Sequence, residues 1–334
     1  MKQTQPDRRS RPALRLVSTK DMSRTDWLEV RKQGIGASDA AAAIGISPYQ
    51  SQLALWMNKT GRDAHRQAQA TEEEDSPTYW GTILEPIVAE EYSRRTGHKV
   101  RRVNAVLQHP DADKAWMLAN LDYSVVANTE VQLLECKTAG EWGSKLWRDG
   151  VPDYVQCQVQ HQLAVTGKQA ADVCVLLCGQ KIEIYRIERD DPLIARIIEL
   201  ERQFWHYVET DTPPPADGSA SAAEALRYLY PEDDGATLDL SEETHWTETF
   251  AELLATREDL TLLQEYEDKL KQRIQQQMGD ASKAVFAQGF VTWKRSKDST
   301  NLDTQALLKE QPDLLEAYPL IKPGSRRFLV RPQN

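Results

Sequence analysis

Two acidic residues and a lysine occur at a spacing that could build a metal-dependent hydrolytic site. Twelve residues separate Asp122 from the segment Glu135-Cys136-Lys137. Alternate side chains of a strand share a face, so Glu135 and Lys137 would lie together, about 6–7 Å apart, while Cys136 points away. Two carboxylates and the Cys136 carbonyl oxygen are the hard ligands that Mg²⁺ or Mn²⁺ prefers. A lysine beside the metal could hold or deprotonate the attacking water.

The same spacing has a simpler interpretation. Asp122 could merely end a strand, while Glu135 and Lys137 form a solvated ion pair on its exposed face. An acid followed two residues later by a lysine is common, so the spacing does not separate the two interpretations. The rest of the chain has to decide between them.

The segments around these residues are predicted to be paired strands. Residues 115–126 and 131–137 are rich in apolar side chains, and the polar residues 127–130 lie between them. This pattern predicts an antiparallel hairpin with Asp122 and Glu135 near the same end. Two further strands and a helix that closes the domain are expected at residues 172–178, 181–187 and 193–208.

A helix is predicted over residues 153–165. Val155, Val159 and Leu163 recur at four-residue spacing and should face the core. A glutamine-rich face is usually solvated, and here that face would carry Tyr154, Gln158, His161 and Gln162.

Two short helices are predicted near the N-terminus, at residues 25–32 and 40–44. Ser38 or Asp39 would begin the second helix, where a hydroxyl or carboxylate can cap the free amides. A helix N-terminus close to an arginine, here Arg31, is also a site that favours anions such as phosphate.

Several separate motifs of this chain occur in an order that is more specific than any one of them. They are Trp27-Leu28-Glu29-Val30-Arg31, Gly34-Ile35-Gly36-Ala37-Ser38-Asp39, Gly81-Thr82-Ile83-Leu84-Glu85-Pro86, Asp122, Glu135-Cys136-Lys137, and Tyr154 with Gln158-Val159-Gln160-His161-Gln162. Together they resemble the YqaJ-type viral recombinase family. This family is a phage-type exonuclease branch related to lambda exonuclease, within the restriction-endonuclease-like PD-(D/E)xK nucleases.

The resemblance implies an α/β (α+β) fold with a restriction-endonuclease-like central mixed sheet flanked by helices. It covers residues 24–210, which would form the nuclease domain. Composition predicts a flexible basic arm before it and a Pro/Ser/Ala linker after it. A C-terminal helical or α+β extension would follow, with a long amphipathic helix and a small basic tail. These parts span residues 1–23, 211–225 and 226–334, with the long helix at about 246–278.

The resemblance also assigns metal ligands. Asp122, Glu135 and the Cys136 backbone carbonyl would bind Mg²⁺, with Mn²⁺ able to substitute. Glu85 matches the acidic residue that helps to organise the metal directly or through water. Sequence alone favours another role for Glu85, because Thr82-x-x-Glu85 is a capping box at a helix start.

Catalytic and DNA-binding roles follow from the same resemblance. Lys137 would assist the nucleophile, while Tyr154 and Gln158 would orient the scissile phosphate or the attacking water. Arg31 and Ser38 match the family positions that hold the DNA 5′-phosphate.

The implied activity is Mg²⁺-dependent 5′-to-3′ degradation of linear double-stranded DNA ends, leaving 3′ single strands for phage-type recombination. The expected partners are DNA ends, a single-strand annealing recombinase protein and further copies of the chain, since relatives form trimeric rings. Two alternatives are a structure- or site-specific endonuclease on the same fold and a non-catalytic DNA-binding scaffold. The intact set of Asp122, Glu135 and Lys137 argues against the scaffold.

The net charge of −10 does not exclude DNA binding, because a nuclease needs local positive potential. No apolar run approaches 18 residues and no apolar segment follows the basic N-terminus, so we expect a cytoplasmic protein. The resemblance implies a phage or prophage origin and a bacterial host cell. No P-loop pattern occurs, so ATP is not expected.

Four cysteines in apolar contexts predict reduced core thiols and no iron–sulfur cluster: Cys136, Cys157, Cys174 and Cys178.

Overall fold

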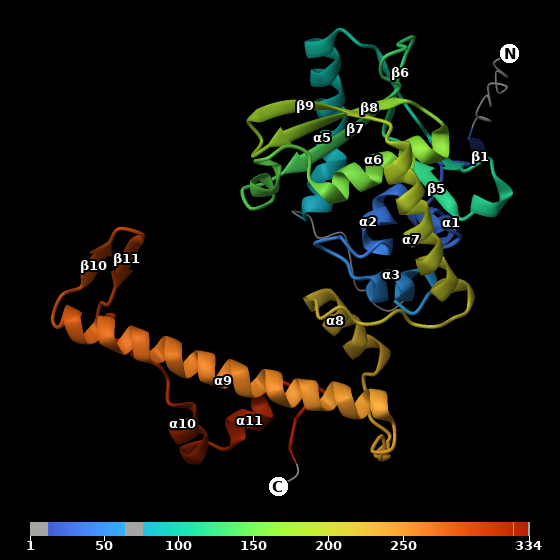
Figure 1. Ribbon diagram of the computed structural model, residues 1–334. Coiled ribbons are helices and arrows are strands. Elements are labelled where there is room, and N and C mark those ends of the chain that lie inside the picture. The colour runs from blue at the N-terminus through green and yellow to red at the C-terminus, as the bar shows by residue number, and fades with distance from the viewer. Residues whose placement is uncertain (1–12, 64–75, 323, 333–334) are drawn as a thin grey trace, which may run out of the picture. The chain divides into compact units, whose positions relative to one another are not determined.

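The computed structural model describes residues 13–63, 76–322 and 324–332 (Figure 1). The chain divides into two compact units, Met1–Tyr230 and Pro231–Asn334. The candidate catalytic residues all belong to the first unit. Within the described part of the chain, no helix is both long and apolar enough to cross a membrane.

A five-stranded mixed sheet forms the centre of the first unit. Its strand order is β3-β6-β7-β8-β9, and only β7 and β8 pair in parallel. The strands are β3 (Val100–Arg102), β6 (Tyr123–Val125), β7 (Leu133–Ala139), β8 (Ala170–Leu177) and β9 (Lys181–Glu188). The predicted mixed sheet is confirmed, and so is the antiparallel pairing of the strands that carry the central motif.

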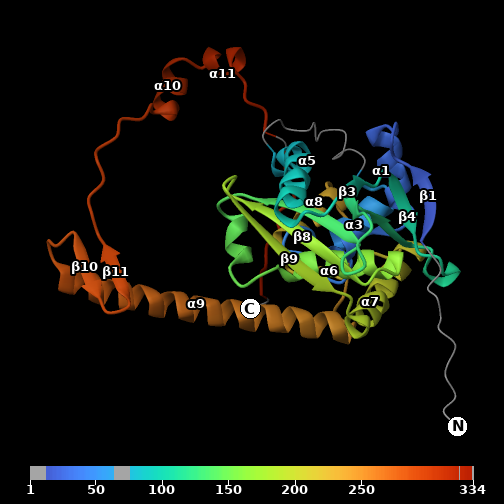
Figure 2. The same ribbon diagram turned by 90° about the horizontal axis from the view of Figure 1, so that it is seen from above.

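Helices α5 (Pro77–Thr96) and α6 (Asp153–Thr166) cover opposite faces of this sheet (Figure 2). Leu134 of β7 packs with Val88 of α5, whereas its neighbour Leu133 packs in the cluster that contains Val155 of α6. Because side chains alternate along a strand, the residue after Leu134 returns to the α6 face. Glu135 is therefore directed toward α6.

A smaller sheet has the order β1-β4-β5-β2. Its strands are β1 (Leu14–Ser18), β4 (Ala105–Gln108), β5 (Met117–Asn120) and β2 (Ile35–Gly36). The flexible arm predicted for residues 1–23 is thus wrong for β1, whose backbone pairs with β4. Residues 1–12 of the predicted arm lie outside the described residues.

The single strand predicted at residues 115–126 is in fact two strands. β5 ends at Asn120 in the smaller sheet, and β6 begins at Tyr123 in the larger one. Leu121 and Asp122 form the crossing between the sheets. Asp122 therefore lies where two strands of different sheets meet.

Further helices complete the first unit. They are α1 (Arg24–Lys32), α2 (Ala40–Ala43), α3 (Gln52–Lys59), α7 (Asp191–Glu209) and α8 (Ala220–Leu229), with a 3-10 turn at Ala37–Asp39. The structure differs from the linker predicted at residues 211–225, because α8 begins within it and packs on α3. Ser219 caps α8, and Ala222 and Ala225 are buried, so an alanine-rich stretch that resembles a linker is a packed helix.

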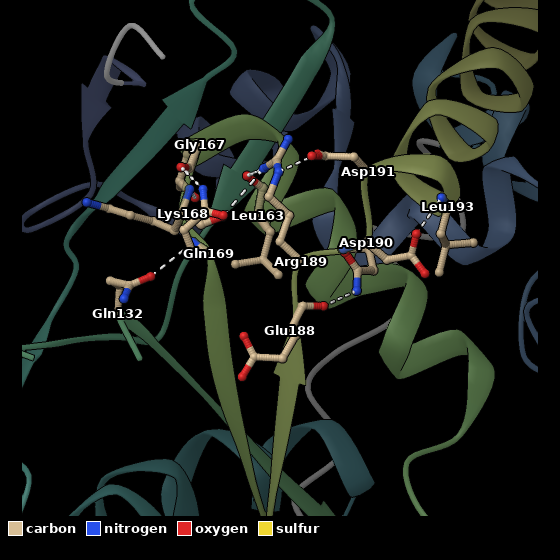
Figure 3. Close-up of polar contacts among 12 residues, drawn as sticks. Gln132, Leu163, Gly167, Lys168, Gln169, Glu188, Arg189, Asp190, Asp191 and Leu193 are labelled. Atoms are coloured by element: carbon tan, nitrogen blue, oxygen red, sulfur yellow. Dashed lines mark hydrogen bonds and ion pairs between the residues drawn. The ribbon is translucent and has the colours of Figure 1, made fainter. Parts of the chain in front are cut away.

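Polar contacts with the β9–α7 junction hold the C-terminal half of α6 (Figure 3). Arg189 donates to the Leu163 carbonyl oxygen and to Asp191 Oδ1 at 2.5 and 2.6 Å. Gln160 Nε2 donates to the Glu188 carbonyl oxygen at 2.8 Å. These contacts fix the helix that supplies the glutamines of the candidate site.

The second unit contains a long helix and small elements around it. Helix α9 (Thr244–Met278) lies where a long helix is predicted at about 246–278. The remaining elements are β10 (Lys283–Phe286), β11 (Gly289–Thr292), α10 (Thr304–Glu310) and α11 (Asp313–Ala317).

The four cysteines are free thiols, but they are not all in the core. Cys157 and Cys174 are buried and Cys136 is partly buried, as predicted. Cys178 is exposed, which corrects the prediction for this residue. It occupies the turn between β8 and β9 with a φ of 50°.

Candidate active site

Asp122 faces the edge of β7 opposite to β8, beyond the point where β7 pairs with β6. Strand β6 pairs with β7 at Leu133 and Leu134, and its register ends there. Two residues further along β7, the Cys136 N–H donates a hydrogen bond to Asp122 Oδ2 at 2.8 Å instead of to a backbone carbonyl of β6. The N–H and C=O of one strand residue point to the same side. The Cys136 carbonyl oxygen is therefore directed toward the side where Asp122 lies.

Glu135 and Lys137 share a face of β7 and are joined by a third side chain. Lys137 Nζ lies 2.7 Å from Glu135 Oε1 and donates to Gln158 Oε1 at 2.9 Å. Gln158 Nε2 in turn donates to Glu135 Oε1 at 2.6 Å. The solvated ion pair considered above is wrong, because the Glu135 side chain is only 4% exposed.

Gln162 also belongs to this group, although the sequence analysis gave it no role in the site beyond its place on the glutamine-rich face. Its Nε2 donates to Glu135 Oε2 at 2.7 Å, so α6 holds both oxygens of Glu135 through amides one helical turn apart. The glutamine-rich face of α6 is thus not solvated. The four-residue spacing of Gln158 and Gln162 was the available signal, because it places them on one face of a helix.

Glu85 lies in the middle of α5, so its interpretation as a capping residue is wrong. The helix begins earlier, with Ser76 accepting a hydrogen bond from the Tyr79 N–H, and Pro86 lies inside it. Glu85 Oε1 is buried and makes no hydrogen bond. The nearest cation is the half-exposed Arg102, whose Nη2 is 3.4 Å away.

One cavity of about 410 Å³ brings the predicted residues together. The chemically relevant side chains that line it are Arg31, Ser38, Glu85, Asp122, Glu135, Lys137 and Gln158, and Cys136 also borders it. Tyr154 is not among the lining residues. It lies in the first turn of α6, where its ring packs edge-on against Tyr49, with centroids 5.5 Å apart.

A second polar cluster supports the Arg31 side of the cavity. Arg31 Nη2 donates to Ser38 Oγ at 2.8 Å and also pairs with Asp39. Asp39 Oδ2 accepts from the Gly36 N–H at 3.1 Å and from Lys59 Nζ at 2.7 Å. Sequence reasoning missed Lys59, although a lone lysine among the apolar residues of α3 was a signal.

Burial and charge have different consequences in the two clusters. Burial, reinforced by Glu135, raises the pKa of Asp122 well above its usual range, and burial raises the pKa of Glu85. Burial alone would lower the pKa of Lys137, but Glu135 and Asp122 outweigh it and raise the pKa. Burial would also raise the pKa of Asp39, yet Arg31 and Lys59 hold it below its usual range.

The acidic side of the cavity suits a cation. Its three carboxylates outnumber the two cations beside them, Lys137 and the half-exposed Arg102, and Glu85 Oε1 accepts no hydrogen bond. Among the described residues, no three of the His, Cys, Asp and Glu side chains converge as a preformed metal cluster. Mg²⁺ commonly uses one or two carboxylates and keeps several waters, so the oxygen donors present fit this ion.

Comparisons with known proteins identify relatives of the chain. Residues 26–169 match the family described as the YqaJ-like viral recombinase domain. The protein YqaJ of Bacillus subtilis (strain 168) is 35% identical over 306 residues, which cover 90% of this chain and 92% of the relative.

Solved structures with lower similarity include two nucleases. The alkaline exonuclease LHK-Exo of Laribacter hongkongensis is 26% identical, with a TM-score of 0.44 over 56% of this chain and 93% of that chain. A phage-related exonuclease of Haemophilus somnus 129PT is 12% identical, with a TM-score of 0.37 over 53% of this chain and 96% of that chain.

Proposed function

Since the chain belongs to the YqaJ-like viral recombinase family, we propose that it is a Mg²⁺-dependent DNA exonuclease that resects linear double-stranded ends from 5′ to 3′. One observation carries the proposal. The group of Asp122, Glu135 and Lys137 lines the same cavity as the hydrogen-bonded pair of Arg31 and Ser38. The first group would act on a phosphodiester while the second holds a terminal phosphate.

Asp122, Glu135 and the Cys136 carbonyl would hold Mg²⁺, with Glu85 contributing directly or through water. Mn²⁺, which prefers the same ligands, would substitute. When bound, the metal lowers the pKa of a water ligand and stabilises negative charge on the phosphate. The raised pKa of Asp122 supports this assignment, because a nearby cation would relieve the cost of its buried charge.

The remaining side chains would orient the attacking water. Lys137 and Gln158 are joined to each other and to Glu135, so their polar groups have fixed positions beside the acids. In the hydrolysis, the water oxygen bonds to phosphorus, the P–O3′ bond breaks, and the 3′ oxygen leaves as a hydroxyl with a proton. Tyr154 has no part in this scheme, because it lies away from the cavity.

Arg31 and Ser38 would bind the 5′-phosphate. A guanidinium and a hydroxyl can both donate to phosphate oxygens, and their mutual hydrogen bond holds them side by side.

In the cell, the 3′ single strand left by resection would pass to a single-strand annealing protein. A ring of identical subunits, which the resemblance implies to be a trimer, would keep the duplex at the cavity.

The proposal is tested with purified protein, Mg²⁺ and matched linear and closed circular duplexes. The linear DNA carries 5′-phosphate or 5′-hydroxyl ends. We expect progressive loss of linear DNA only, faster with the phosphate, and no loss with Lys137→Ala. Lys181→Ala is the matched control, because Lys181 is exposed on the edge strand β9 and pairs with Glu183.

The other outcomes separate the alternatives. Cutting of the closed circle would move the assignment to an endonuclease. A wild-type protein that is inactive on every substrate but binds DNA would indicate a scaffold.

A further inference from the structure

Lys59 is a buried charge that core packing does not explain. Its side chain is 0% exposed at the end of α3, whose residues Leu53, Trp56 and Met57 are buried apolar side chains. Burying an ammonium group is costly unless it is paired, and an apolar residue of similar length would fill the same space. The contacts of Lys59 therefore show what the charge does.

Both contacts of the ammonium group lead to Arg31. Lys59 Nζ donates to Asp39 Oδ2 at 2.7 Å and to the Arg31 carbonyl oxygen at 2.8 Å. Asp39 Oδ1, the other oxygen of that carboxylate, pairs with the Arg31 guanidinium. One carboxylate is thus shared between two cations.

The charge count of these three groups is positive. Arg31 and Lys59 contribute two positive charges, and Asp39 contributes one negative charge. Asp63 also attracts Lys59, but more weakly than Asp39 does, and it accepts a hydrogen bond from Asn58. Arg31 is 21% exposed and lines the cavity, whereas Lys59 is fully enclosed. The surplus charge is consequently available to a ligand only through Arg31.

We propose that Lys59 is a positioning residue that sets the preference for a 5′-phosphate end, because it neutralises Asp39 and leaves the Arg31 charge free for the phosphate. Without Lys59, Asp39 would bind Arg31 as a closed neutral pair. The inference rests on the proposed function, in which Arg31 and Ser38 hold the phosphate. It adds a residue behind that pocket that never touches DNA.

A purely structural role for Lys59 predicts something different. If Lys59 only tethered α3 to Asp39, removing both partners would be as harmful as removing one. If Lys59 acts through charge, removing Asp39 as well would return the positive charge of Arg31. Lys59→Met and the double variant Asp39→Asn/Lys59→Met separate the two roles.

The experiment uses the full chain and duplexes with 5′-phosphate or 5′-hydroxyl ends. Binding is measured by fluorescence anisotropy without divalent metal, so that no DNA is cut, and resection rates are measured with Mg²⁺. We expect Lys59→Met to lower the ratio of affinities for the two ends about tenfold, the order of one charge interaction near a surface. The double variant should return to within about threefold of the wild type.

Lys32→Met is the matched control, since Lys32 is the residue next to Arg31 but pairs with Glu29 and does not line the cavity. It should leave the ratio unchanged. If Lys59→Met does not fold, the double variant alone decides, because a tenfold loss of its ratio would overturn the proposal. An unchanged ratio in Lys59→Met would also overturn it.

Failure of the proposed function has a separate signature. A wild-type protein without nuclease activity on any end would refute the exonuclease, while the binding ratio still tests Lys59. A wild-type protein that degrades DNA but binds both ends equally would refute the 5′-phosphate pocket of Arg31 and Ser38, and the role of Lys59 with it, but not the exonuclease.

Discussion

Two aspartates, the partly buried Asp122 and the buried Asp39, belong to the same region of the molecule but have opposite pKa shifts. Asp122 has a carboxylate neighbour, Glu135, and burial raises its pKa. Asp39 lies between Arg31 and Lys59, which hold its pKa low despite burial. Burial is common to both, so the charged partners decide the sign.

The difference separates a site that needs a ligand from one that does not. Asp39 is already paired with two cations of the protein, Arg31 and Lys59, and its carboxylate holds Arg31 in position. The three carboxylates of the Asp122 group outnumber their two cations, Lys137 and Arg102, and one oxygen of Glu85 accepts no hydrogen bond. An external cation would therefore complete the group around Asp122, whereas the group around Asp39 has no need of one.

Asp122→Asn should have the largest effect. It should lower the resection rate at least about a thousandfold, since several kcal/mol of transition-state stabilisation depend on the metal. The amide oxygen can still accept from the Cys136 N–H, and the repulsion of Glu135 is gone. The metal-free variant should therefore be at least as stable as the wild type in urea denaturation. A clear loss of stability would contradict the comparison.

Asp39→Asn should have the converse effect, a loss of stability. The Lys59 ammonium would stay buried without its carboxylate, and breaking a buried pair costs about 3–5 kcal/mol. Adding Lys59→Met should recover most of that loss in urea denaturation. Asp111→Asn is the control, because Asp111 pairs with Lys114 at the surface and should cost less than about 1 kcal/mol. An equal loss in the single and double variants would refute the pairing argument.

Local patterns in the sequence predicted the centre of the site. The alternation along a strand was sufficient to place Glu135 and Lys137 on one face, and a polar turn was sufficient to predict the pairing of β6 with β7. The order of motifs identified the family, which the match to YqaJ confirms. These features depend on neighbouring residues and on motif order, both of which a sequence displays.

Features that depend on long-range packing were not predictable in this way. The burial of Gln162 and Lys59 requires β7 and Asp39, which are distant in the sequence. The prediction of a capping box at Glu85 was wrong because the helix already begins after Ser76, which caps it nine residues earlier in the chain. Tyr154 precedes Gln158 by four residues, but it lies in the first turn of α6, where its ring packs against Tyr49.

Gln162→Leu should have an intermediate effect on the acidic cluster. Glu135 would keep the amide of Gln158 but lose the donor on its other oxygen. Loss of a hydrogen bond to a metal-binding residue typically costs about 10–100-fold in metal affinity or activity. The measurement is the Mg²⁺ concentration that gives half the maximal rate, which should rise. Gln156→Leu is the control on the same helix, since Gln156 binds the Val151 carbonyl oxygen; an equal rise there would contradict the role of Gln162.

A third buried carboxylate, Glu201, extends the comparison with the smallest expected effect. Its partner His161 lies with Nδ1 at 2.6 Å from Glu201 Oε1 and with Nε2 at 2.9 Å from the Leu118 carbonyl oxygen. Burial alone would lower the pKa of His161, but Glu201 outweighs it and raises the pKa above the usual 6.5. A histidine whose pKa is raised on folding stabilises the fold fully below its unfolded pKa.

That stabilisation should be lost as the pH rises from about 6.5 through the raised pKa of the folded protein. Thermal denaturation midpoints of the metal-free protein should fall over this range, and His161→Gln should remove this part of the fall. Because each pKa unit corresponds to about 1.4 kcal/mol, the loss should be smaller than that of Asp39→Asn. An identical pH profile in the variant would show that His161 beside Glu201 is not charged. Of the three carboxylates Asp122, Asp39 and Glu201, only Asp39 would then be neutralised by cations of the chain.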